Sequence, residues 1–184
     1  QAQVVDSQSP DLATGFAKLL SAVRSHVEPD KAHEAEQTLS EGGYFTAFLE
    51  CELAQCAADI SRPTDESPET ERAAYASRKL SLSRCLAASG RRDEALQTAQ
   101  EATNLYRTLA KHNPGAYSPS LAMSLNNLAL RLAEDGQRDK ALKAAQEATD
   151  RYHDLAREDR ELYDPNYATS LNNLAKYLAE DGQR

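Results

Sequence analysis

The chain repeats itself at a fixed interval of 46 residues, and this repetition constrains its fold more than any other feature. The segment SLNNLALRLAEDGQR (124–138) returns as SLNNLAKYLAEDGQR (170–184), with 13 of 15 positions identical. Upstream, RRDEALQTAQEATNLYRTLA (91–110) aligns without a gap on QRDKALKAAQEATDRYHDLA (137–156). A period of about 20–50 residues indicates stacked repeats, because a single repeat cannot bury its apolar face alone.

Each unit has the pattern of two helices. In the second unit, leucines recur at helical spacing and predict one apolar stripe: Leu121, Leu125, Leu128 and Leu132. Gly136 is expected to end that helix, and Asp139 to cap the next one, as Asp93 does one unit earlier. The expected buried positions of the second helix are Ala141, Leu142, Ala145, Ala148, Tyr152 and Leu155.

A capping side chain followed by proline is a helix-start signal, and it occurs four times. The predicted starts are Ser9 with Pro10, Ser67 with Pro68, Ser118 with Pro119, and Asp164 with Pro165. Among the aromatic residues, Tyr106 and Tyr152 are predicted to lie in the core, and Tyr117 and Tyr163 to pack at the junctions between units.

The run LNNLALRLAEDGQRDKALKAAQEA resembles a tetratricopeptide repeat. In the second unit the matching positions are Leu128, Ala129, Leu132, Gly136, Ala141 and Ala148. In the first unit they are Leu82, Ser83, Leu86, Gly90, Ala95 and Ala102, and in the third they are Leu174, Ala175, Leu178 and Gly182. The resemblance implies an all-α fold, a right-handed α-solenoid of stacked antiparallel helix pairs. The usual period is about 34 residues. The phrase SLNNLA and the longer period resemble the kinesin-light-chain type and the arrays of large fungal and bacterial multidomain proteins, with the extra residues mostly lengthening the second helix.

Four segments follow from this alignment. Residues 1–66 are predicted to form a degenerate capping repeat with helices at about 10–27, 30–41 and 44–60. Residues 67–123 and 124–169 form the first and second repeats, and 170–184 the first helix of a truncated third repeat. The chain is therefore interpreted as a fragment of a longer array, with an unpaired helix at its end.

Composition narrows the function classes. The net charge is −8, with a net of −9 over residues 1–75 and +1 over 76–184. Neither part has the clustered basic face that nucleic-acid binding requires, so no nucleic-acid partner is expected. Apolar runs are too short for a transmembrane helix, and no membrane partner is expected. The three cysteines, Cys51, Cys56 and Cys85, do not form a disulfide or metal pattern, which favours a reducing, cytoplasmic setting.

No catalytic constellation stands out in the sequence. The chain has no phosphate-binding loop, zinc-protease motif or nucleophile elbow, and its four histidines are not in register with the repeat. We therefore expect no enzyme activity, no cofactor and no metal site.

The candidate binding site is the inner groove that first helices line in such an array. The predicted peptide- or protein-binding residues are Ser81, Arg84, Asn126, Asn127, Leu130, Asn172, Asn173 and Lys176. Amide side chains in successive units can hold the backbone of an extended peptide, and the two basic residues can pair with acidic groups on it. The alternative is structural: Asn127 and Asn173 bond the neighbouring repeat and lock the stack.

Two functions remain open from the residues alone. The first is a non-catalytic protein–protein interaction module that binds a peptide or protein segment in the groove. The second is a structural or regulatory arm of a larger protein, which packs on an effector domain or self-associates through its exposed C-terminal end.

Overall fold

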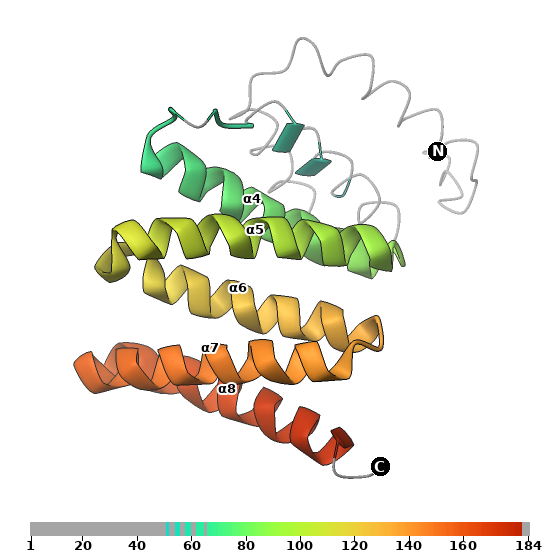
Figure 1. The fold of residues 1–184 in the computed structure, drawn as a ribbon, viewed down its shortest axis with the longest axis vertical. Helices are drawn as coiled ribbons and strands as arrows, with labels where there is room; N and C mark the ends of the chain where they lie inside the picture. Colours follow the sequence, from blue (N-terminus) through green and yellow to red (C-terminus); the bar gives the residue numbers. More distant parts are fainter. Residues whose placement is uncertain (1–50, 52–53, 56–57, 60–61, 65, 182–184) are drawn as a thin grey trace, which may run out of the picture.

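The computed structural model describes residues 51, 54–55, 58–59, 62–64 and 66–181, and over these ranges the chain is helical with no strand. Five helices follow one another (Figure 1): α4 (Glu69–Ala88), α5 (Arg92–His112), α6 (Pro114–Glu134), α7 (Arg138–Glu158) and α8 (Arg160–Asp181). The predicted all-α class is confirmed for this part of the chain.

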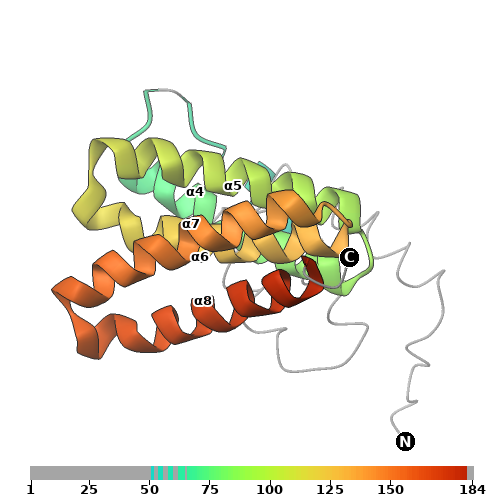
Figure 2. The ribbon, with the colours of Figure 1, turned by 60° about the horizontal axis from the view of Figure 1, so that its bottom comes forward.

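Each helix packs against the helix that follows it in the chain, so the five lie in a row (Figures 1 and 2). Beyond these consecutive pairs, α4 also approaches α6. The order along the row is therefore the order along the sequence, as expected for a helical repeat in which each unit contacts its neighbours.

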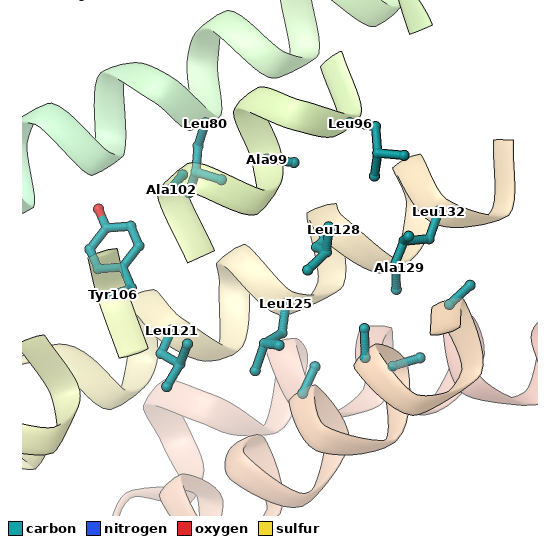
Figure 3. Packing of buried hydrophobic residues seen from close by; sticks show 14 of the residues in the cluster. Leu80, Leu96, Ala99, Ala102, Tyr106, Leu121, Leu125, Leu128, Ala129 and Leu132 are labelled. Atoms are coloured by element: carbon teal, nitrogen blue, oxygen red, sulfur yellow. The ribbon is translucent and has the colours of Figure 1, made fainter. Parts of the chain in front are cut away.

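The core runs through the row from α4 to α8. The predicted leucine stripe of α6 is confirmed: Leu121, Leu125, Leu128 and Leu132 are all buried, between α5 on one side and α7 on the other (Figure 3). Alanines of α5 and α7 pack against this stripe. Because alanine has no side chain beyond Cβ, these alanines let the helices approach closely.

Glycines end the first helix of the first and second units, as predicted. Gly90 and Gly136 have φ values of 80° and 76°, in the left-handed region that L side chains avoid. After α4, the Arg91 amide donates to the Leu86 carbonyl at 2.8 Å, and after α6 the Gln137 amide donates to the Leu132 carbonyl at 2.8 Å. These bonds satisfy the last carbonyls of each helix in the Schellman pattern.

The predicted aspartate caps are wrong. The residues at the helix entrances are Arg91 for α5 and Gln137 for α7, and neither helix has a side-chain cap. Asp93 and Asp139 lie in the first turn instead, where a carboxylate offsets the positive end of the helix dipole.

Two of the predicted helix starts are also wrong. Pro119 and Pro165 lie inside α6 and α8, which begin at Pro114 and Arg160. Asn113 caps α6, accepting from the Ala116 amide at 3.3 Å. Each internal proline is at the sixth helical position. Because proline has no N–H, each removes one intrahelical hydrogen bond, and both helices continue through it. The start after Ser67 and Pro68 is close to its prediction, since α4 begins at Glu69.

The long period arises differently from the expectation. The extra residues do not mostly lengthen the second helix: α7 ends at Glu158, and the segment from Arg160 already belongs to α8. The helices α5, α6 and α7 are all 21 residues long. Single residues, Asn113 and Asp159, separate the second helix of one unit from the first helix of the next.

Most of the predicted capping region lies outside the described residues, including the helices expected at 10–27 and 30–41. Within the helix expected at 44–60, residues 51, 54–55 and 58–59 are helical. Cys51, Ala54 and Ala58 are buried against Leu82, Leu86 and Ala95. No helix in the described part of the chain is long and apolar enough to cross a membrane.

Candidate binding site

A hollow of about 260 Å³ opens between α6 and α8, with α7 contributing to it. Three helices supply its lining: Met123, Asn126, Asn127 and Leu130 from α6, Tyr152 from α7, and Asn166, Thr169, Asn173 and Tyr177 from α8. Since α6 and α8 are the first helices of successive units, the hollow lies where the repeat predicts a groove.

Half of the predicted site residues line this hollow and half do not. Asn126, Asn127, Leu130 and Asn173 are brought together from α6 and α8. The others lie outside the lining, with Ser81 half-buried and Arg84, Asn172 and Lys176 exposed. The two predicted basic residues are therefore not part of the hollow.

Asn126 has a structural role. Its Oδ1 accepts a hydrogen bond from the Ser170 hydroxyl of α8 at 3.3 Å. Ser170 is fully buried, and its Oγ lies 2.8 Å from Oγ1 of Thr149 in α7. These polar contacts connect α6, α7 and α8. Asn126 therefore has the stack-locking role that the structural alternative gave to Asn127 and Asn173.

Asn127 and Asn173 are arranged differently from Asn126. The Asn127 Nδ2 donates at 3.3 Å to the Met123 carbonyl of its own helix, not to a neighbouring unit. The side chains of Asn166 and Asn173 make no hydrogen bond to any residue that the structure describes. The hollow thus contains amide groups that are available to a bound segment.

Tyr152 is the most deeply buried residue of the lining. It is 5% exposed as a whole, and its hydroxyl makes no hydrogen bond within the described residues. Burial, with a smaller effect of Tyr163, raises the pKa of Tyr152 to about 12. The hydroxyl is therefore protonated at neutral pH and can donate to an acceptor placed in the hollow.

Five lining residues are absent from the predicted binding residues: Met123, Tyr152, Asn166, Thr169 and Tyr177. Tyr152 was assigned to the core alone, and Asn166 was expected at the very start of a helix rather than in its second turn. Tyr177 occupies the position that Arg131 has one unit earlier, and this is one of the two differences between the copies of the 15-residue segment. That difference was the one signal that marked position 177.

The chemistry of the lining is uncharged. No Asp, Glu, Lys, Arg, His or Cys is among the lining residues, which combine amides, hydroxyls and apolar groups. Met123 and Leu130 are among the most exposed large apolar side chains in the described part of the chain, and they lie beside the amides of α6. Such a surface suits a segment with a polar backbone and apolar side chains.

Charged groups gather at a second, separate hollow of about 390 Å³ near the junction of α7 and α8. Arg160 pairs with Asp164 at 3.6 Å, and the ring of His153 packs against that of Tyr167 with centroids 5.6 Å apart. Arg157 completes the basic side of this hollow. Its acidic and basic groups are mixed, which does not form the clustered basic face that nucleic acid requires.

Within the described residues, no group of three or more His, Cys, Asp or Glu side chains is arranged to hold a metal ion. No protein-family model matches this chain, and no curated protein matches it.

Proposed function

We propose that the protein is a non-catalytic binding module of the tetratricopeptide type, which holds an extended, uncharged segment of a partner protein in the hollow between α6 and α8. In this proposal the helix row is part of a right-handed solenoid, and the hollow belongs to its inner groove. The observation that carries the proposal is the Tyr152 hydroxyl: it belongs to a residue that is only 5% exposed and that lines the hollow, and it makes no hydrogen bond within the described chain.

The donor and acceptor groups of the hollow fit a peptide backbone. A backbone presents one N–H and one C=O per residue, and an asparagine side chain can donate to the carbonyl and accept from the N–H. Asn166 and Asn173 on α8 supply such amides, and Tyr152 supplies a further donor. A partner carbonyl at Tyr152 would accept a hydrogen bond from a hydroxyl that has no partner within the described residues.

The apolar groups of the hollow select the side chains of the segment. Met123 and Leu130 lie seven residues apart on α6 and are both exposed, so they lie on one side of that helix. Apolar side chains of the bound segment would cover them. Because the lining carries no charge, an acidic or basic side chain would lose hydration there without gaining a partner.

The non-catalytic part of the proposal rests on the same lining. Acid–base and nucleophilic catalysis need a titratable or activated group near neutral pH. The ionisable groups of this hollow are its tyrosines, and the pKa of Tyr152 is displaced away from neutrality.

The test is a selection of random peptides displayed on phage, with the protein as bait. Tyr152→Phe removes only the hydroxyl from the hollow. Tyr106→Phe removes a hydroxyl at the equivalent position of α5, outside the hollow, and is the matched control. We expect enriched peptides to lose about tenfold in affinity with Tyr152→Phe and to bind Tyr106→Phe as the wild type, since an unpaired hydrogen-bond partner costs about 1–3 kcal/mol.

A second variant tests the apolar contribution. Met123→Asp places a charge in the lining, at a side chain that is already 44% exposed, so folding is preserved. Peptides that bind Met123→Asp and Tyr152→Phe as tightly as the wild type, or a selection that enriches no peptide, would contradict the proposal.

A further inference from the structure

Asn126 is held by a short chain of buried hydroxyl groups next to the hollow. The Ser170 hydroxyl of α8 donates to Asn126 Oδ1 at 3.3 Å, and its Oγ lies 2.8 Å from Thr149 Oγ1 of α7. Ser170 and Thr149 are buried, with exposures of 0% and 4%, whereas Asn126 is half-buried and lines the hollow. Asn126 is thus the point at which this buried chain of hydroxyls reaches the candidate site.

The number of hydrogens determines the direction of the chain of hydroxyls. A hydroxyl has one hydrogen to donate, and an amide oxygen only accepts. Because Ser170 gives its hydrogen to Asn126 Oδ1, the hydrogen between Ser170 and Thr149 comes from Thr149. Thr149 Oγ1 also lies 2.8 Å from the Ala145 carbonyl, and these two acceptors share its hydrogen. The chain therefore runs from Thr149 through Ser170 to the oxygen of Asn126.

This direction leaves the nitrogen of the Asn126 amide for the hollow. An amide whose oxygen faces Ser170 has its two N–H groups directed elsewhere, and Nδ2 makes no hydrogen bond within the described residues. The Tyr152 hydroxyl is a second donor of the lining without a partner in the described chain. Donors from α6 and α7 thus line one hollow, and a carbonyl oxygen has two lone pairs with which to accept from them.

The equivalent position one unit earlier shows that the fold does not require an asparagine here. Leu80 occupies the position of Asn126 and is buried in the core. Ser124, the equivalent of Ser170, donates at 2.8 Å to the Leu121 carbonyl of its own helix. The serine therefore bonds across the helices in the unit where an asparagine accepts from it, and bonds within its own helix in the unit where a leucine stands there.

We propose that Ser170 is a positioning residue of the binding site. It holds the amide of Asn126 so that Nδ2 donates, beside the Tyr152 hydroxyl, to a backbone carbonyl of the bound segment. An asparagine without such a bond can present either its oxygen or its nitrogen, and turning the amide of Asn126 would break the bond to Ser170. The hollow therefore favours a carbonyl over an N–H at this point. The inference rests on the proposed function, because it requires a segment in the hollow.

The probes are the peptides that the wild-type protein enriches in the phage selection, labelled with fluorescein and titrated by fluorescence anisotropy. Ser170→Ala removes the hydroxyl that orients Asn126, and we expect the affinity to fall about three- to tenfold. Asn126→Asp keeps an oxygen that accepts from Ser170 but replaces the Nδ2 donor by a second oxygen. We expect this variant to lose about tenfold or more in affinity.

The matched control is Ser124→Ala, which removes an equally buried hydroxyl whose hydrogen bond stays within α6. Ser124 does not line the hollow, so we expect the affinity to stay within about twofold of the wild type. The thermal melting of every variant is followed by circular dichroism, which separates a loss of fold from a loss of binding.

A double-mutant cycle separates positioning from packing. Asn126→Leu introduces the residue that the chain itself has at the equivalent core position, Leu80. In the Asn126→Leu protein, Ser170→Ala has no amide to release, and we expect it to cause less than about a twofold further loss of affinity. Peptides with dissociation constants of about 1 µM are used, so that losses of up to about a hundredfold stay measurable.

Three outcomes overturn the inference. One is wild-type affinity of Ser170→Ala, and another is wild-type affinity of Asn126→Asp, which would place the amide oxygen toward the hollow. The third is an equal loss from Ser170→Ala with Asn126 and with Leu at position 126, which would show that Ser170 acts through packing. In each case the proposed function stands if Tyr152→Phe and Met123→Asp weaken the same peptides. A selection that enriches no peptide contradicts the proposed function and this inference with it.

Discussion

The two tyrosines at equivalent positions of α5 and α7 lie in different surroundings. The Tyr106 region comprises α4, α5 and α6, and the Tyr152 region comprises α6, α7 and α8. Tyr106 donates to the Ala73 carbonyl at 3.2 Å, and Ser77 and Ser120 lie beside its hydroxyl. Burial raises the pKa of Tyr106, and the two serines oppose that rise. Tyr152 has no such partner in the described chain.

The difference follows from a few substitutions between units. The positions of Ser77 and Ser120 are occupied by Met123 and Asn166 in the Tyr152 region, and the position of Leu80 by Asn126. The serines are small, and α4 approaches α6 closely enough to be in contact. The larger residues stand around the hollow between α6 and α8. The same backbone plan thus gives the Tyr106 hydroxyl partners within the chain and leaves the Tyr152 hydroxyl beside a hollow.

The largest expected difference concerns Leu125 and Leu171, which are equivalent leucines. Leu125 is fully buried, so Leu125→Ala should lower the free energy of unfolding by about 2–5 kcal/mol. Leu171 is 40% exposed, and Leu171→Ala should cost less than about 1 kcal/mol. Urea denaturation of the two variants measures both values, and equal losses would mean that Leu171 is buried in solution.

The glycine turns are where the two regions should behave alike. Gly90→Ala and Gly136→Ala each force an L side chain into left-handed backbone, which costs about 1–2 kcal/mol. A Cβ would meet no atom within 4 Å at either glycine, so the cost is that of the backbone alone. We expect thermal melting to report nearly equal losses. A clearly larger loss at one turn would show that it carries a tertiary contact.

A smaller difference in the free energy of unfolding is expected between variants of the two tyrosines. Tyr106→Phe leaves the Ala73 carbonyl without its donor and should lower the free energy of unfolding by about 1 kcal/mol. Tyr152→Phe breaks no hydrogen bond in the described chain and should change it by less than about 0.5 kcal/mol. Guanidinium denaturation of the ligand-free variants measures both losses. A larger loss for Tyr152→Phe than for Tyr106→Phe would contradict this prediction.

The smallest effect concerns an ion pair of the Tyr106 region. Lys79 and Glu101 are 2.9 Å apart, at positions where the Tyr152 region has Leu125 and Glu147. Burial raises the pKa of Glu101, but the hydrogen bond and the charge of Lys79, with smaller effects of Gln97 and Arg62, together outweigh it, so the net pKa lies below its ordinary value of 4.5. Glu101→Gln should cost about 0.5 kcal/mol or less at pH 7, because Glu101 is partly exposed.

The pH dependence of that cost has a definite sign. A carboxyl whose pKa is lowered on folding contributes stability above pH 4.5, and the contribution disappears as the pH falls through the lowered folded value. The difference between wild type and Glu101→Gln, measured by urea denaturation across this range, should therefore shrink on acidification. A difference that is constant with pH would show that packing, not charge, causes it.

Much of the fold could be predicted from the sequence because repetition makes each signal appear twice. The stripe of leucines and the glycine turns were located correctly, since helical periodicity and left-handed backbone have strong residue preferences. The helix starts at Pro119 and Pro165 were misplaced, because a proline near the start of a helix looks alike at the first position and at the sixth.

The candidate site was predictable only in outline. Periodicity placed Asn127 and Asn173 on equivalent faces, but it could not tell that Asn126 bonds Ser170 across the helices. Nor could it tell that Tyr152 borders the hollow between α6 and α8 while the Tyr106 hydroxyl bonds the Ala73 carbonyl, because that depends on the combined bulk of side chains from three helices. The roles of Ser81, Arg84, Asn172 and Lys176 in binding stay predictions.

The connections between helices also determine where this protein can accept an insertion. At Asn113 and Asp159 a single residue joins two helices of different units. One added residue that continued either helix would rotate the next by about 100° and turn its buried stripe towards solvent. The turns at Gly90 and Gly136 are exposed and leave open space around the glycine. A tag or a reporter domain is therefore best grafted at these turns, where it would leave the register of every helix unchanged.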